Sequence, residues 1–458
     1  MAVTEDVGSP GLVGGIAARI RAWLADGSDR SLAQRTAGAA FLIRVGSAAL
    51  LYLSQILLAR WMGSFEFGVY VYVWTWVLLI GGFGDIGLAL AAQRFIPEYT
   101  GRKALDLLRG FLSGSCWLTF AIATAIAVAG ALGVKLIEPW LSHYLVIPLY
   151  LACLTLPLYA LENMLDGIAR TYNWINLALL PPYIGRPLVL ILVMLAAHLA
   201  GMPANAATAM VAAVIATWLN AVVQLVMVSR RLKSTVAPGP KAYAVGSWFK
   251  TAIPIFMVGS FYLLLTYTDI IVLELFRTPD EVAVYYAAAK TIALVAFVNF
   301  SVAAAATHKF TEYHVAGDHA RLAAFLADAI KWTFWPSLVG TVLILALGKP
   351  FLWLFGEKFL DGYSLMFILS IGLVSRAAIG PVERLLNMLG EQRACATVYA
   401  LAFALNLGLC FVLIPRLGAM GAAIATTCAM LTESTLLFIV TKRRLGLHVF
   451  VFGSPRPK

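Results

Sequence analysis

The fold is decided between residues 37 and 92, which read AGAAFLIRVGSAALLYLSQILLARWMGSFEFGVYVYVWTWVLLIGGFGDIGLALAA. Two apolar segments, about 37–59 and 69–92, flank a short turn, and each is long enough to cross a bilayer, which takes roughly 20 helical residues. Each segment also contains a charged residue, Arg44 in the first and Asp85 in the second. The stretch therefore predicts a transmembrane helical hairpin that carries charges inside the membrane.

The composition extends this prediction to the whole chain. Of its 458 residues, 61% are hydrophobic and 12% are charged, and the mean hydropathy is +0.86. A soluble protein has about 45–50% apolar and about 25% charged residues. We therefore expect an all-α, polytopic membrane protein without a large soluble domain. The net charge of +11 does not imply nucleic acid, because membrane proteins concentrate Lys and Arg in cytoplasmic loops.

The five cysteines all fall in apolar segments and form no C-x-x-C pair. A disulfide framework and a zinc site are therefore not expected, and no metal site is predicted. The six histidines are scattered and show no metal-ligand spacing. No G-x-x-x-x-G-K-[ST] motif is present, so the sequence shows no built-in ATPase.

We expect about twelve membrane-spanning helices. They lie at about 37–59, 69–92, 110–134, 145–165, 178–200, 206–228, 251–275, 283–306, 326–348, 364–388, 395–414 and 420–441. Basic residues crowd into alternate connecting segments, which predicts that both termini lie in the cytoplasm. Residues 1–35 form a cytoplasmic segment. Leu12, Ile16, Ile20 and Trp23 recur there at helical spacing, so this segment is either an amphipathic helix or a disordered tail.

The chain divides into two halves. Residues 36–228 form an N-lobe of helices 1–6, residues 251–441 form a C-lobe of helices 7–12, and residues 442–458 form a cytoplasmic tail. The basic linker between the lobes, 229–250, contains Pro238-Gly239-Pro240. An internal repeat supports the division, because Glu66-Phe67-Gly68-Val69-Tyr70 returns as Glu281-Val282-Ala283-Val284-Tyr285.

Charged residues inside membrane spans are rare and usually face a protein interior or a water-filled cavity. By their depth, we select four cations as candidate contacts for an anionic substrate in the cavity: Arg44, Arg186, Lys290 and Arg376. Three acids are candidates for ion coupling or for ion pairs: Asp85, Asp269 and Glu433. Their depths also allow Arg44 to pair with Asp85, and Asp269 to pair with Lys290, as purely structural ion pairs.

Four passages follow one another in a characteristic order. They are QILLARWMG at 55–63 running into FGVY at 67–70, GDIGL at 84–88 followed by QRF at 93–95, Asp269 with YYAAA at 285–289, and LFGEKF at 354–359 with IPRLGAMGAA at 414–423. With these motifs the chain resembles the polysaccharide flippases of the multidrug/oligosaccharidyl-lipid/polysaccharide exporter superfamily. The resemblance covers about residues 37–441.

The resemblance implies two six-helix lobes around a central cavity. It implies a transporter, not an enzyme, that moves undecaprenyl-pyrophosphate-linked oligosaccharide to the periplasmic leaflet by alternating access, for O-antigen (lipopolysaccharide), exopolysaccharide or capsule synthesis. No cofactor is expected. Transport would be driven by H⁺ or Na⁺ coupling or by the membrane potential alone. The expected partners are the lipid-linked oligosaccharide, the membrane, and a polysaccharide polymerase and chain-length regulator.

Two alternatives stay open. A cation-coupled multidrug antiporter would have the same fold but would favour an acidic cavity, whereas the charges here include more cations. A membrane polysaccharide polymerase or ligase would usually have a sizeable periplasmic loop. The longest outer loop here, about 348–363, is short and holds no paired catalytic residues.

Overall fold

The computed structural model describes residues 29–453, without the side chains of residues 29–45 and of a few residues between 258 and 319. The predicted amphipathic segment around residues 12–23 lies outside this part. All regular elements in the described part are helices, as predicted. They are α2 (Asp29–Phe83), α3 (Leu88–Gly101), α4 (Leu105–Ile137), η1 (Glu138–Trp140), α5 (His143–Thr171), α6 (Ile175–Leu180), η2 (Pro181–Gly185), α7 (Arg186–Leu199), α8 (Ala206–Thr235), α9 (Val245–Phe276), α10 (Pro279–Ile292), η3 (Ala293–Val295), α11 (Ala296–Val315), α12 (His319–Ala346), α13 (Gly348–Phe355), η4 (Glu357–Gly362), α14 (Tyr363–Ile379), α15 (Val382–Met388), α16 (Gln392–Leu417) and α17 (Ala419–Leu445).

The described part contains eleven helical stretches that are long and apolar enough to cross a membrane. The first, Gly46–Gly101, holds both arms of the opening hairpin, because α2 turns back on itself at Gly63. Gly63 has φ 78° and ψ 173°, a backbone conformation that favours glycine. Counting this stretch as two spans gives the predicted twelve.

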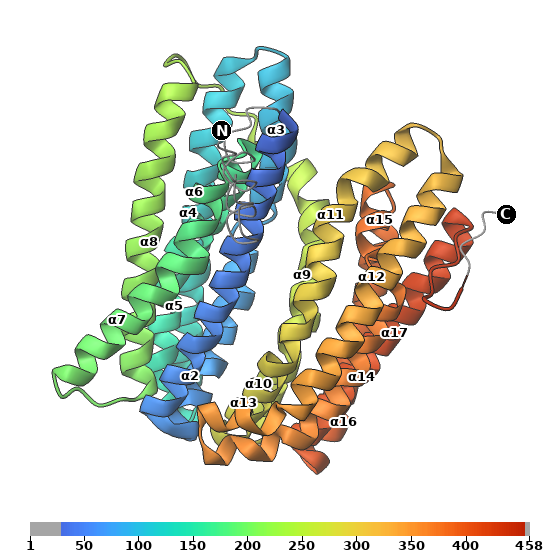
Figure 1. The fold of residues 1–458 in the computed structure, drawn as a ribbon. Coiled ribbons are helices and arrows are strands. Elements are labelled where there is room, and N and C mark those ends of the chain that lie inside the picture. The colour runs from blue at the N-terminus through green and yellow to red at the C-terminus, as the bar shows by residue number, and fades with distance from the viewer. Residues whose placement is uncertain (1–28, 454–458) are drawn as a thin grey trace, which may run out of the picture.

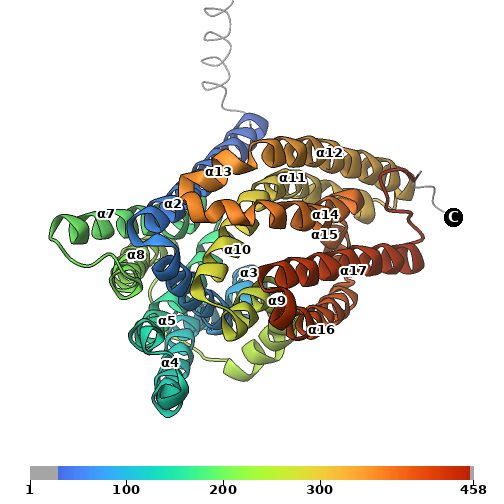
Figure 2. The ribbon, with the colours of Figure 1, turned by 90° about the horizontal axis from the view of Figure 1, so that it is seen from below.

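The helices gather into two lobes (Figure 1). Helices α2–α8 form one lobe and α9–α17 the other. The lobes meet at the lower end of the view, around α2, α10 and α13, and diverge toward the upper end. Seen from below, α10 and α13 lie beside α2 (Figure 2). The connections that the loop charges predict to be cytoplasmic lie at the upper end, so we call this the inner end and the opposite one the outer end.

Three hydrophobic cores explain this shape. The first joins both lobes, with Phe67 and Tyr70 of α2 packed together with Tyr285 of α10 and Phe355 of α13. The second contains mostly helices of the N-terminal lobe, and the third only helices of the C-terminal lobe and the chain that follows α17. Burial of apolar surface thus holds the lobes together at the outer end through the first core, and it also joins the start of α9 to the N-terminal lobe through Trp248 of the second core.

The internal repeat is confirmed by a shared hydrogen bond. Glu66 accepts a hydrogen bond from the backbone N–H of Ala206, at the start of α8, over 2.8 Å. Glu281 accepts one from the backbone N–H of Ala419, at the start of α17, over 3.2 Å. A carboxylate at a helix N-terminus accepts a hydrogen bond from an otherwise unpaired backbone N–H, and its negative charge interacts favourably with the helix dipole. The repeated glutamate therefore caps the last helix of each lobe.

Two predicted spans are interrupted. The span predicted at 69–92 breaks at Gly84–Gly87, where Ile86 (φ 45°) and Gly87 (φ 78°) end one helix before α3 begins. The span predicted at 364–388 breaks between α14 and α15 at Gly380, which has φ 62° and precedes a proline. Both breaks lie on the inner half of their lobe.

Candidate functional site

The first candidate cation, Arg186, forms an ion pair inside the N-terminal lobe. Arg186 begins α7, directly after the wide helical turn of η2. Its Nη1 lies 3.1 Å from Oε2 of Glu162 on α5. The Glu162 side chain is 1% exposed and the Arg186 side chain 19% exposed. The guanidinium also lies 5.1 Å from the ring centroid of Tyr159 and 5.7 Å from that of Trp74, in the range of cation–π attraction.

The second cation, Arg376, forms a similar pair in the C-terminal lobe. Its Nη2 lies 3.1 Å from Oε1 of Glu433. Arg376 is on α14 and Glu433 on α17, so the ion pair joins these two helices. The glutamate side chain is 2% exposed and the arginine side chain 25% exposed. The prediction of an ion pair at Glu433 is therefore confirmed, and its partner is one of the predicted cavity cations.

Helix α9 packs against α2, whose Trp74 lies beside Arg186, and against α17, which carries Glu433. In each pair the glutamate lies behind the arginine, and only the arginine reaches solvent. A guanidinium has five N–H donors, and each of these contacts uses one.

Their depths allowed Asp269 and Lys290 to pair, but no direct ion pair joins them among the described residues. Asp269 instead accepts hydrogen bonds from the hydroxyl groups of Tyr285 and Thr426 and from its neighbouring backbone N–H. Lys290 is exposed, and its Nζ lies 5.1 Å from the ring centroid of Tyr286. The two residues lie at similar depths in the membrane, but depth does not determine the direction in which a side chain points.

Asp85 caps a helix and is not part of a described ion pair. Its carboxylate accepts hydrogen bonds from the backbone N–H groups of Gly87 (3.0 Å) and Ala89 (3.3 Å). These bonds hold the turn that starts α3. The predicted partner, Arg44, lies on α2, but its side chain is outside the described residues. Its role stays a prediction.

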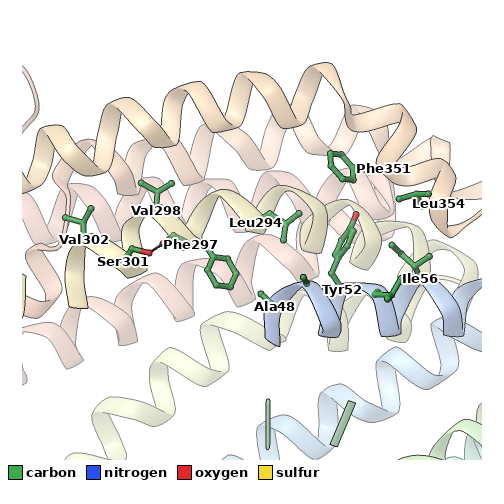
Figure 3. Close-up of a pocket in the computed structure, with 12 residues that line it drawn as sticks. Ala48, Tyr52, Ile56, Leu294, Phe297, Val298, Ser301, Val302, Phe351 and Leu354 are labelled. Atoms are coloured by element: carbon green, nitrogen blue, oxygen red, sulfur yellow. Dashed lines mark hydrogen bonds between the residues drawn. The ribbon is translucent and has the colours of Figure 1, made fainter. Parts of the chain in front are cut away.

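An apolar pocket of about 710 Å³ lies between the lobes (Figure 3). One wall is α2, with Ala48, Tyr52 and Ile56, and the opposite wall is η3 and α11, with Leu294 and Val298. Further residues of these elements and of α13 complete the lining: Ala49, Leu53, Phe297, Ser301, Val302, Phe351 and Leu354. Apart from Ser301 and the Tyr52 hydroxyl, the lining side chains are apolar. The pocket therefore suits a hydrocarbon chain.

Polar contacts close the outer end below this pocket. Arg60 of α2 donates hydrogen bonds to the backbone carbonyl oxygens of Leu354 (2.6 Å) and Trp353 (2.5 Å) on α13. Ser64 donates to Asp280 of α10, which also pairs with Lys358 of η4 over 2.7 Å. We call this set, Arg60, Ser64, Asp280 and Lys358, the outer seam.

Sequence reasoning missed the outer seam and the partner of Arg186. Arg60 and Asp280 lie next to span ends, where a charge is ordinary. Glu162 resembles an interfacial residue by its depth, yet its side chain is nearly inaccessible. The offset of the internal repeat carried a usable signal, because it places Ser64 opposite Pro279, beside the aspartate that Ser64 contacts.

A family model described as "Polysaccharide biosynthesis protein" matches residues 35–310, which is more than half of the chain. No curated protein matches the chain.

Several solved transporters have a similar structure. The lipid II flippase MurJ, in an inward closed conformation, is 16% identical with a TM-score of 0.70, over 88% of this chain and 87% of that one. An inward-facing multidrug resistance transporter of the MATE family is 15% identical with a TM-score of 0.68, over 88% and 94%. A transporter of the MOP superfamily from Pyrococcus furiosus, described as having a binding pocket of reverse polarity, is 14% identical with a TM-score of 0.65, over 90% and 95%. These similarities establish the fold.

Proposed function

Because this chain belongs to the polysaccharide biosynthesis protein family, we propose that it is a flippase for undecaprenyl-pyrophosphate-linked oligosaccharide. The substrate would move from the cytoplasmic to the periplasmic leaflet by alternating access of the two lobes. The fold is shared with multidrug transporters, so the proposal depends on features of this chain rather than on the fold.

The apolar pocket between α2 and α11 is the observation that carries the proposal. A lipid-linked sugar has a long hydrocarbon chain that is best left in an apolar environment while the head group crosses. The pocket lies between the lobes and is lined almost entirely by apolar side chains. It offers the lipid chain a place beside the route of the head group, which a soluble drug would not need.

The two partly exposed arginines support a pyrophosphate head group. Arginine binds phosphate oxygens through charge-assisted, often bidentate hydrogen bonds. Arg186 and Arg376 each keep an exposed fraction, and each uses one nitrogen in its described ion pair, while the glutamate behind each one fixes its position. Lys290, which is exposed on α10, adds a third positive charge, and we assign Arg44 to the same group on depth alone.

The driving force follows from the charge of the substrate. With a negative cell interior, outward movement of each negative charge is favoured by about 2.3 kcal/mol per 100 mV. The membrane potential could therefore drive export by itself, and H⁺ or Na⁺ exchange would add to it. Of the acids proposed for ion exchange, Asp85 and Asp269 form no ion pair among the described residues, whereas Glu433 is paired with Arg376.

We place the protein in the bacterial inner membrane with both termini in the cytoplasm. The periplasmic product would be the substrate of a polysaccharide polymerase, and we propose such a polymerase and its chain-length regulator as partners. This placement is supported by the basic residues in the inner connections and by the eleven described stretches able to cross a membrane.

Complementation of a deletion strain tests the proposal. Wild-type protein should restore surface polysaccharide, whereas Arg186→Ala and Arg376→Ala should not, at equal protein levels in the membrane. Arg416→Ala, which removes an exposed arginine from the outer end of α16, serves as the control and should complement. Full complementation by both cavity variants would refute the head-group contacts. A deletion strain that gains drug sensitivity but keeps its surface polysaccharide would instead favour a multidrug antiporter.

A further inference from the structure

Glu274 is a buried acid at the contact between the two lobes, and neither the family match nor the proposed cavity accounts for it. It lies near the outer end of α9 and is 9% exposed. Across the lobe boundary, the hydroxyl group of Tyr144 on α5 donates a long hydrogen bond of 3.4 Å to Oε1 of Glu274. Its other oxygen, Oε2, is buried and has no hydrogen-bond partner among the described residues.

The surroundings of Glu274 contain no described counter-ion. It faces Tyr144 from α5 and interacts with Tyr72 from α2. Arg277, directly after the end of α9, is the nearest cation in sequence, but its guanidinium donates to carbonyl oxygens of α16. On α10, Asp280 is held by Ser64 and Lys358. The described side chains of α16 and α17, which also pack against α9, form no ion pair with Glu274.

An ionised carboxylate in this position would be buried without a positive partner and with one oxygen unsatisfied. Such a charge costs several kcal/mol unless it is neutralised or hydrated. A neutral carboxyl group avoids this cost, and it still accepts the hydrogen bond from Tyr144. Hydration requires the lobes to separate at the outer end. The closed contact therefore fits the protonated acid, and the open one fits the ionised acid.

We propose that Glu274 is a proton-binding site that operates the outer end of the protein. The outer end closes when Glu274 takes up a proton from the periplasmic side, and loss of that proton favours its opening. The inference rests on the two-lobe cycle of the proposed flippase but not on the identity of its substrate. It makes the return of the empty carrier dependent on external pH.

The distance between the lobes at the outer end tests this inference without any substrate. Spin labels are attached at Trp140→Cys in η1 and at Arg416→Cys in α16, two exposed positions on opposite lobes. The full-length protein carries serine in place of its five native cysteines and is reconstituted in lipid nanodiscs. Pulsed electron paramagnetic resonance then gives the populations of closed and open molecules between pH 5.5 and pH 8.5.

In the protein with native Glu274, the ratio of open to closed molecules should rise with pH, by at most about tenfold per pH unit for one proton. Glu274→Gln, which imitates the neutral acid, should stay closed at every pH. The matched control Glu357→Gln changes an exposed acid of η4, also at the outer end, and should keep the native pH response. Tyr144→Phe should keep the pH response, because the acid and its burial remain.

A distance distribution that does not change with pH in the native-Glu274 protein would overturn the inference. An unchanged pH response in Glu274→Gln would overturn it as well. If Glu274→Gln does not fold, the pH response of the native-Glu274 protein and of Glu357→Gln still tests the inference, because a constant distance distribution in both would overturn it. Failure of the flippase proposal appears separately, as full complementation by Arg186→Ala and Arg376→Ala without any change in these distances.

Discussion

The ion pair of Arg186 and Glu162 should respond very differently to the loss of each partner. Arg186→Gln leaves Glu162, which is 1% exposed, without its positive partner. Removing one partner of a buried pair typically costs about 3–5 kcal/mol. Glu162→Gln leaves an arginine that is 19% exposed and still lies against Tyr159 and Trp74. We expect this change to cost only about 1–3 kcal/mol.

The double variant, Arg186→Gln with Glu162→Gln, separates stability from transport. Replacing both charges of a buried pair is often close to neutral for stability, so the double variant should be more stable than Arg186→Gln alone. It should still fail to complement, because the cation proposed to bind pyrophosphate is missing. Arg170→Gln is the control, since its pair with Asp166 is more exposed, at 32% and 22%, and should cost at most about 1 kcal/mol.

Thermal unfolding in detergent measures these differences. The five cysteines are free and none is fully exposed, so a thiol-reactive dye reports unfolding directly. The reasoning is refuted if Arg186→Gln is no less stable than Glu162→Gln, or if the double variant is as unstable as Arg186→Gln. Full complementation by the double variant would show that Arg186 does not contact the head group.

Three further predictions concern the space between the lobes. Ala48→Trp should fill the apolar pocket and abolish complementation without lowering the melting temperature, whereas Leu51→Trp on the exposed side of α2 should complement. Asp280→Asn should weaken the outer seam, because the carboxylate joins Ser64 to Lys358, and should raise the open population in the spin-label measurement. Gly68→Ala should prevent closure of the outer end, because its new Cβ would overlap the backbone carbonyl of Pro279; an unchanged closed population would contradict this.

The helices were largely predictable because their signal is local. Apolar length set the number of spans, and the offset of 215 residues between Glu66 and Glu281 predicted a repeat that the two helix caps confirm. The interruptions at Gly87 and Gly380 were not predicted, because a glycine inside an apolar run can equally serve close packing. Their positive φ values come from the tertiary structure.

The candidate site was predictable only in part. Depth identified Arg186, Arg376 and Glu433, since a charge far from both interfaces has to face protein or water. Depth could not identify partners, because partners also depend on the direction in which each side chain leaves its helix. Glu162 and Glu274 lie nearer to helix ends, where a charge is unremarkable, and only the packing of neighbouring helices makes them buried.

The hydrophobic core shared by both lobes at the outer end also determines what the protein does without cargo. Facing outward would pull Phe67 away from Tyr286, Phe355 and Phe359, whose rings it now contacts. The separated rings would meet water unless something apolar covered them, and each Å² exposed costs about 25 cal/mol. A lipid chain in the neighbouring pocket is well placed to provide that cover. If the proposed flippase cycle holds, an idle molecule should therefore rest open at its inner end, and a bound lipid chain should ease the separation of the lobes at the outer end.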